Sequence, residues 1–149
     1  MASLIRSLAD YEKLLHMCVG TEQELQGALF GPDPAAEVLI AEVDGISVGF
    51  ALFFHTFSTF LARRGLWLED LFVVPEARGR GVGTALLTRL ARIAVERQCG
   101  RFEWAVLDWN TPAIRFYERL GATLMQDWRI VRVTGEALER LGRKFEMRS

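Results

Sequence analysis

Three glycines at alternate positions restrict how the middle of this chain can fold. Gly79, Gly81 and Gly83 lie between an apolar segment that ends at Pro75 and a helix-patterned segment that ends at Gly100. Glycine adopts left-handed backbone conformations without steric cost, so the segment predicts a tight turn between a strand and a helix. Backbone N–H groups of such a turn form a small anion site, which the helix dipole strengthens. Glycines at such turns also occur for their geometry alone.

Hydrophobic periodicity on both sides of this turn predicts a single α/β or α+β domain that spans residues 1–149 around a mixed sheet. Helices are expected over residues 4–17, 21–31, 111–121 and 136–143, and between residues 79 and 100. Strands are expected over residues 38–43, 46–57, 66–74 and 102–107, with one or two closing strands between 122 and 133.

Local signals mark the ends of three of these elements. Thr21 and Glu24 have the spacing of a capping box, which starts a helix. Asp44-Gly45 lies between two apolar runs and predicts a tight hairpin turn. Thr111-Pro112 supplies an expected N-cap and a first-turn proline for the helix that ends at Gly121.

The charge balance predicts no nucleic-acid partner and no membrane partner. The chain has 18 Lys and Arg against 19 Asp and Glu, a formal net charge of -1, so no global field attracts anionic polymers or lipids. Its longest apolar run, around Val48–Phe54, is much shorter than the roughly 20 residues that span a bilayer. Residues 1–6 lack the pattern of a secretory signal, which favours a cytoplasmic location.

The histidines and cysteines predict neither a metal site nor a covalent intermediate. Cys18 and Cys99 form no C-x-x-C pair, and His16 and His55 stand on apolar stretches without ligand spacing. The chain also lacks a Ser-His-Asp or Cys-His order. Direct attack by an acceptor group is therefore the simpler mechanism.

The glycine turn differs from two common nucleotide-binding loops. The sequence has no G-x-x-x-x-G-K-[ST] and no G-x-G-x-x-G at this turn. What remains is R-x-x-G-x-G, from Arg78 to Gly83, followed by an apolar helix. The stretch from Val74 to Gly83 resembles the acetyl-CoA pyrophosphate loop of the GCN5-related N-acetyltransferase (GNAT) superfamily.

A second stretch, from Asp108 to Ala122, resembles the CoA-contacting helix of the same superfamily. It carries Asn110 and then F-Y-x-x-x-G-A, in which Tyr117 matches the family's tyrosine near the thioester sulfur. The two stretches occur in the order that the superfamily has. The resemblance implies a GNAT fold, which is a mixed, mostly antiparallel sheet flanked by helices. Family members usually have a strand before the first helix, and this sequence starts at or just before that helix, so either the start is shortened or the edge strand is absent.

Three shorter stretches resemble the diamine acetyltransferases, the group that contains the spermidine/spermine and thialysine N-acetyltransferases. These stretches are Gly49–Phe54, Leu68–Val73 and Ala105–Asn110, and the resemblance runs from about Leu4 to Leu141. It implies transfer of an acetyl group from acetyl-CoA to a primary amine of a small diamine or lysine-like substrate, in a homodimer. A protein lysine or N-terminal acetyltransferase and a non-catalytic acyl-CoA-binding module are the alternatives.

The resemblance also implies roles for individual residues. Glu69 would accept the amine proton, directly or through water, and Tyr117 would protonate the departing thiolate. Tyr11, Glu12, Glu69 and Asp70 would line the amine site. The backbone before the turn would pair with pantetheine and polarise the acetyl carbonyl. The expected acetyl-CoA contacts are Leu71, Phe72, Val73, Arg78, Gly79, Arg80, Gly81, Val82, Gly83, Thr84 and Asn110.

Each assignment has a structural alternative that the sequence leaves open. Glu69 and Asp70 also suit a solvated acidic pair at a strand end, and Asp70 lies on the opposite strand face from Glu69 if the pleat is regular. Tyr117 also suits a tyrosine that packs its helix against the sheet. Tyr11 and Glu12 also suit an ordinary helix surface.

Overall fold

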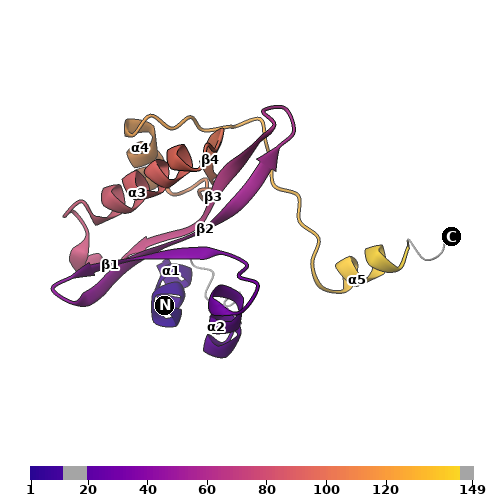
Figure 1. Ribbon diagram of the computed structural model, residues 1–149, viewed down its shortest axis with the longest axis horizontal. Helices are drawn as coiled ribbons and strands as arrows, with labels where there is room; N and C mark the ends of the chain where they lie inside the picture. Colours follow the sequence, from indigo (N-terminus) through magenta and orange to yellow (C-terminus); the bar gives the residue numbers. More distant parts are fainter. Residues whose placement is uncertain (12–19, 145–149) are drawn as a thin grey trace. The chain divides into compact units, whose positions relative to one another are not determined.

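The structure, a computed structural model, describes residues 1–11 and 20–144 and divides the chain into two compact units. The first unit, Met1–Leu107, contains a four-stranded sheet with helices on both faces (Figure 1). The second unit, Asp108–Ser149, contains two helices in its described part. Residues 12–19 and 145–149 lie outside the described chain.

Two helices precede the sheet, α1 (Ala2–Tyr11) and α2 (Glu22–Phe30). The predicted capping box of α2 is confirmed, because the Glu24 amide donates to Thr21 Oγ1 at 3.1 Å and the Thr21 amide donates to the Glu24 carboxylate at 3.4 Å. α2 ends at Gly31, as predicted. The expected continuation of the first helix to residue 17 falls outside the described residues.

β1 (Glu37–Val43) and β2 (Ile46–Ser58) form the predicted hairpin. Asp44 and Gly45 both have left-handed backbone conformations, with φ of 53° and 77°. A type I′ turn needs positive φ at both central residues, and this requirement explains why Asp-Gly occurs here. β1 forms one edge of the described sheet.

The sheet has the strand order β1-β2-β3-β4, with β3 (Arg63–Val73) and β4 (Arg101–Trp104) completing it. β2 pairs with β3 in the antiparallel sense, and β3 pairs with β4 in the parallel sense. The parallel pair is connected by α3 (Val82–Glu96), as a parallel pairing requires. The mixed, mostly antiparallel sheet is confirmed. β4 is shorter than the predicted strand over residues 102–107.

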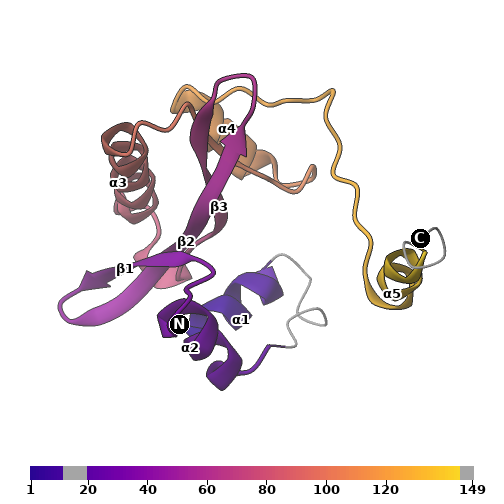
Figure 2. The same ribbon diagram turned by 45° about the vertical axis from the view of Figure 1, so that its right-hand side comes forward.

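The core lies on both faces of this sheet, with α3 on one face and α1 on the other (Figure 2). On the α1 side, Leu4 packs against Phe50 and Phe72. On the α3 side, five apolar residues of the helix are buried: Leu86, Leu87, Leu90, Ile93 and Ala94. No helix among the described residues is long and apolar enough to cross a membrane.

An ion pair joins the end of α3 to the hairpin. Arg97 donates through both terminal nitrogens to the carboxylate of Glu37, at 2.7 and 2.9 Å. Its Nη1 also lies 3.3 Å from His55 Nε2, which accepts when the imidazole is neutral. The Arg97 hydrogen bond lowers the pKa of Glu37 below its usual 4.5. Burial, and then the charge of Arg97, lower the pKa of His55 below 6.5, with Arg64 adding to the effect and Glu37 opposing it.

Lowering the pH is expected to lower the free energy of unfolding in two steps, because the pKa values of His55 and Glu37 are both lowered in the folded chain. The unfolded chain protonates His55 more readily than the folded chain does, so stability falls below about pH 6.5. The same argument applies to Glu37 below about pH 4.5. Each step is expected to be under about 1 kcal/mol, because Arg97 and Glu37 are partly exposed and solvent screens their charges. Urea unfolding at several pH values measures both steps, and His55→Gln should remove the first. Equal stability at about pH 7.5 and 5.5 would contradict this assignment.

In the second unit, α4 (Thr111–Arg119) differs from the prediction at its start. The N-cap is Asn110 rather than Thr111, and Thr111 is the first helical residue. Proline in the first turn is confirmed. The end of α4 is a Schellman motif, in which Gly121 has a φ of 97° and the Gly121 and Ala122 amides donate to the Glu118 and Tyr117 carbonyls.

The prediction of closing strands between residues 122 and 133 is wrong for this structure. That segment has no strand, and Trp128, Ile130 and Val131 are strongly exposed. A strand needs a neighbour for its backbone hydrogen bonds, and the described part of the second unit contains only α4 and α5 (Gly135–Arg143) as regular elements. The final helix itself is confirmed, one residue earlier than predicted.

Candidate functional site

A β-bulge at Glu69 shapes the middle of β3. Leu52 of β2 pairs with Asp70, but the next residue, Phe53, pairs with Leu68, so Glu69 is an extra residue without an opposite partner. A bulge kinks its strand and redirects a side chain, and bulges are common beside active sites. The regular pleat that would place Asp70 and Glu69 on opposite faces is therefore absent.

The bulge changes which side chains share a face. Trp67 pairs with Phe54 and Asp70 pairs with Leu52, so both lie on the sheet face of Phe54 and Leu52. In an unbroken strand, residues 67 and 70 would lie on opposite faces. Phe72 lies on the same face and packs against Leu4 of α1.

The carboxylate of Glu69 is held by a neighbour on the same strand. Trp67 Nε1 donates to Glu69 Oε2 at 2.9 Å, and the Glu69 side chain is exposed. An exposed carboxylate with one oxygen in a hydrogen bond keeps acceptor capacity on the other oxygen. Glu69 can therefore accept a proton from a group that approaches from solvent.

Beyond Glu69, β3 has an edge that β4 does not cover. The ladder to β4 runs only from Gly65 to Leu68, and β3 continues to Val73. In the described part of the first unit, the backbone of residues 69–73 on this side is thus outside the β4 ladder. Leu71, Phe72 and Val73, the residues expected to contact pantetheine, belong to this uncovered segment.

Arg78, at the start of the glycine turn, contacts the end of β3. Its Nε donates to the Val73 carbonyl at 2.9 Å, and its guanidinium lies 5.4 Å from the centre of the Phe72 ring. A short 3₁₀ helix, η2 (Pro75–Ala77), connects the two. Arg78 therefore contributes to the geometry of the turn as well as to its positive charge.

The turn has the features that an anion site needs. Gly79 and Gly81 have φ of 78° and 81°, and a Cβ at either position would meet nothing within 4 Å. The first hydrogen bond within α3 runs from the Ala85 amide to the Gly81 carbonyl, so the amides of Val82, Gly83 and Thr84 precede the helical ladder. These amides and the helix dipole favour a phosphate here.

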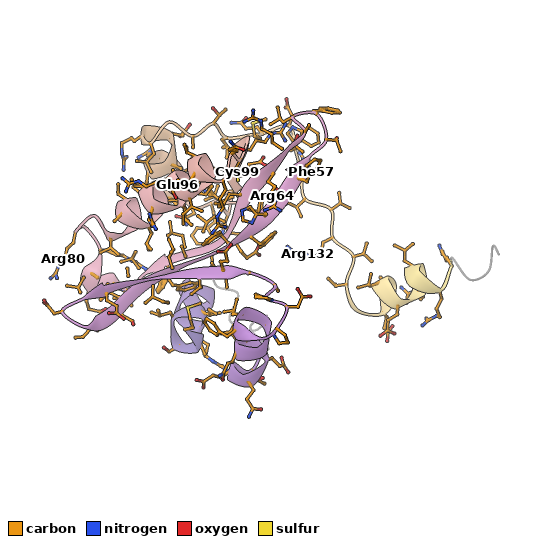
Figure 3. All side chains as sticks on the ribbon, in the orientation of Figure 1. Phe57, Arg64, Arg80, Glu96, Cys99 and Arg132 are labelled. Carbon is orange, nitrogen blue, oxygen red and sulfur yellow. The ribbon has the colours of Figure 1, made fainter. Side chains whose placement is uncertain are left out.

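Arg80 lies at the tip of this turn and extends away from the ribbon (Figure 3). It is exposed, and so is Thr84 in the first turn of α3. A flexible cation beside free helix amides adds charge to an anion site, although solvent screens the contribution. The turn thus has the backbone shape and the positive charge of a phosphate site.

Asn110 and Tyr117 belong to the second unit. Asn110 is the N-cap of α4, is 8% exposed, and accepts from the Ile114 amide through its carbonyl. Tyr117 is half-buried, with its ring 5.5 Å from that of Phe116. The first-unit site residues, from Glu69 to Thr84, thus lie on one continuous strand–turn–helix segment, whereas Asn110 and Tyr117 lie at the start of α4 and within it.

The remaining predicted residues are Tyr11 and Glu12. Tyr11 is the last residue of α1, and its side chain is not among those described. Glu12 lies outside the described residues. No three of the described His, Cys, Asp and Glu side chains are grouped as a metal ion would need.

The contact between Trp67 and Glu69 was not predicted from the sequence. The only signal for it is the W-x-E spacing, because residues two apart on a strand lie on the same face. Such spacing is common and does not identify a hydrogen bond. The bulge that accompanies this contact depends on the partner strand.

Comparison with known proteins gives consistent similarities. The family model for the acetyltransferase (GNAT) family matches residues 6–122. The chain is 36% identical to the thialysine N-epsilon-acetyltransferase of Mus musculus, over 93% of this chain and 87% of the mouse protein. It is 33% identical to the L-ornithine N5-acetyltransferase NATA1 of Arabidopsis thaliana, over 91% and 79%. An integron cassette protein from the mobile metagenome of V. cholerae has a similar structure, with a TM-score of 0.79, 28% identity, and coverage of 95% and 88%.

Proposed function

Because the chain belongs to the acetyltransferase (GNAT) family and is an N-acetyltransferase, we propose that it transfers the acetyl group of acetyl-CoA to a primary amine of a small diamine or lysine-like substrate. One observation carries the proposal. The bulged carboxylate Glu69 and the left-handed glycine turn lie on one continuous segment, with the uncovered part of β3 and then η2 between them.

The spacing along β3 suits a long cosubstrate. The four residue steps from Glu69 to Val73 span roughly 13 Å of strand. A cosubstrate whose phosphates bind at the turn needs an extended arm along this strand to bring its acetyl group to Glu69. The pantetheine arm of acetyl-CoA has amide groups that pair with an open strand edge, and residues 69–73 offer such an edge.

On the amine side, Glu69 performs the proton transfer in this proposal. A lysine-like amine has a pKa of about 10.4, so neutralising it at physiological pH costs about 4 kcal/mol. The amine nitrogen attacks the acetyl carbon, its proton passes to the Glu69 carboxylate directly or through water, and the carbon–sulfur bond breaks. Asp70 attracts the cationic end of the substrate, and Tyr11 and Glu12 line the amine site.

On the CoA side, the proposal gives the remaining roles to Tyr117 and Asn110. Tyr117 gives its phenolic proton to the departing thiolate, because a phenol near pKa 10 and a thiolate of similar basicity exchange a proton with little energetic mismatch. Asn110 contacts CoA. The family match runs through the boundary at residues 107 and 108, which supports a single functional domain over residues 1–149.

The substrate class follows from the relatives. The mouse and Arabidopsis proteins are named for thialysine and L-ornithine, two small amino acids with a terminal side-chain amine. We therefore include a free amino acid of this type among the expected acceptors.

The proposed enzyme is cytoplasmic and homodimeric. Light scattering on the purified protein measures its mass and so tests the homodimer.

Release of CoA measured against a panel of acceptors tests the proposal. The panel contains thialysine, L-ornithine, L-lysine, spermidine and a lysine-containing peptide. Turnover with the free amines above that with the peptide supports it. Turnover only with the peptide would indicate a protein acetyltransferase, and tight acetyl-CoA binding without turnover would indicate a binding module.

Gly83→Leu is expected to weaken acetyl-CoA binding by at least about tenfold, or about 1.4 kcal/mol. Gly83 lies in the first turn of α3, and the one atom near its missing Cβ is Val73 Cγ2 at 3.9 Å. The fold therefore tolerates a side chain, which instead occupies the space that a phosphate needs. Calorimetry measures the affinity. Gly27→Leu is the matched control, because Gly27 lies inside α2 with nothing within 4 Å. Equal affinity in both variants would contradict the phosphate site.

A further inference from the structure

The orientation of the Glu69 side chain depends on its hydrogen bond with Trp67. It is the extra residue of a bulge, and its exposed side chain has several accessible rotamers. Ordering a free glutamate side chain costs conformational entropy. The hydrogen bond from Trp67 Nε1 to Glu69 Oε2, at 2.9 Å, restricts this freedom before any substrate binds.

The position of Trp67 in the sheet allows it to restrict the motion of the Glu69 side chain. It lies in the middle of the sheet, paired with Phe54 of β2 on one side and with Glu103 of β4 on the other. Its ring is half-buried, and a tryptophan side chain has only two rotatable angles. The packing of Trp67 in the sheet therefore fixes the position of its indole N–H.

The chemistry of the indole limits what Trp67 can do. An indole nitrogen donates one hydrogen bond and accepts none, so it cannot take a proton from an amine. Its donation to a carboxylate is charge-assisted and occupies one side of Oε2. Oε1 remains available for the approaching amine or for a bridging water.

From this geometry we propose that Trp67 is a positioning residue for the acetyl transfer. Its indole N–H fixes the Glu69 carboxylate with Oε1 toward the amine, so that the base is oriented before the substrate arrives. The inference rests on the proposed function, in which Glu69 accepts the amine proton. Tryptophan at this position thus acts through Glu69 and contacts neither the acetyl group nor the transferred proton.

Trp67→Phe tests this role, because it keeps an aromatic ring and removes the donor. It is expected to lower kcat about tenfold, with the acetyl-CoA KM and the melting temperature near those of the wild type. Trp104→Phe is the matched control, since Trp104 is a half-buried indole on the adjacent strand. We expect it to leave kcat unchanged. Full activity of Trp67→Phe would overturn the inference.

A double-mutant cycle separates positioning from packing. In the Glu69→Ala background the carboxylate is absent, so Trp67→Phe is expected to have no further effect on kcat. The same tenfold loss in both backgrounds would show a packing role and overturn the inference, while the proposed base would stand. A Glu69→Ala variant as active as the wild type would remove the proposed base role and the inference together.

A spectroscopic measurement covers the case in which Trp67→Phe fails to fold. The indole N–H signals of ¹⁵N-labelled protein report hydrogen bonding directly, and the chain has four tryptophans. Glu69→Ala is expected to shift the Trp67 indole signal and to speed its exchange with solvent, leaving the other three nearly unchanged. An unshifted Trp67 signal would show that the contact is absent in solution and would overturn the inference.

Discussion

Glu69→Gln is expected to lower kcat/KM for the amine by roughly 10²-fold or more at neutral pH, with little change in acetyl-CoA affinity. Gln keeps the size of the side chain and an oxygen that can still accept from Trp67, so the bulge and the strand should persist. It cannot accept the amine proton. Steady-state kinetics with varied amine and calorimetry with acetyl-CoA measure the two quantities on the same preparation.

The loss caused by Glu69→Gln should shrink as the pH rises. The fraction of neutral amine in solution increases tenfold for each pH unit below its pKa of about 10.4, so the need for an enzymic base decreases. Asp70→Asn is the matched comparison, because it removes a carboxylate one residue away on the same strand. We expect a higher amine KM from Asp70→Asn and a smaller change in kcat. A Glu69→Gln variant as active as the wild type would transfer the base role to Asp70.

The strand–turn–helix of the phosphate site could be predicted from the sequence because its signals are local. Gly81 sits at the N-cap of α3 in a left-handed conformation, which glycine adopts without steric cost. The apolar positions of α3 repeat with the helical period, and five of them are buried. The same holds for Asp44-Gly45, where two consecutive positive φ values require this residue pair or a similar one.

The geometry around Glu69 could not be predicted in this way, because a bulge depends on the register of two strands. Phe53 pairs with Leu68 and Leu52 with Asp70, and nothing in the residues from Leu66 to Val73 marks which one is extra. A one-residue change in register moves every following side chain to the other face. Alternation along β3 alone would therefore place Asp70 and Trp67 on opposite faces, whereas the observed pairing places both on the face of Leu52 and Phe54.

The segment between residues 122 and 133 shows a similar limit. Its apolar residues suggested strands, but a strand forms only where a neighbour accepts its backbone hydrogen bonds. α4 was easier to predict, because Pro112 in its first turn and Gly121 after its end are signals within the helix itself. The N-cap was misplaced by one residue because Asn110 and Thr111 both suit that position by type.

Tyr117→Phe is expected to lower kcat by roughly 10²-fold or more if the hydroxyl protonates the departing CoA thiolate. The variant keeps the aromatic ring, and the ring contact with Phe116 needs no hydroxyl. The Tyr117 carbonyl closes the Schellman motif at the end of α4 through the backbone, so the substitution leaves that motif intact. Acetyl-CoA affinity and the melting temperature should therefore stay near the wild-type values.

A structural role for the same hydroxyl predicts the reverse pattern. Loss of one hydrogen bond would then lower the free energy of unfolding by roughly 1 kcal/mol, with kcat almost unchanged in the folded fraction. Phe116→Leu is the matched control, because it disturbs the ring contact and keeps the hydroxyl, so it should lower stability more than kcat. Measuring kcat and melting temperature for both variants on the same preparations distinguishes the two roles. A Tyr117→Phe enzyme with full kcat would mean that water or another residue delivers the proton.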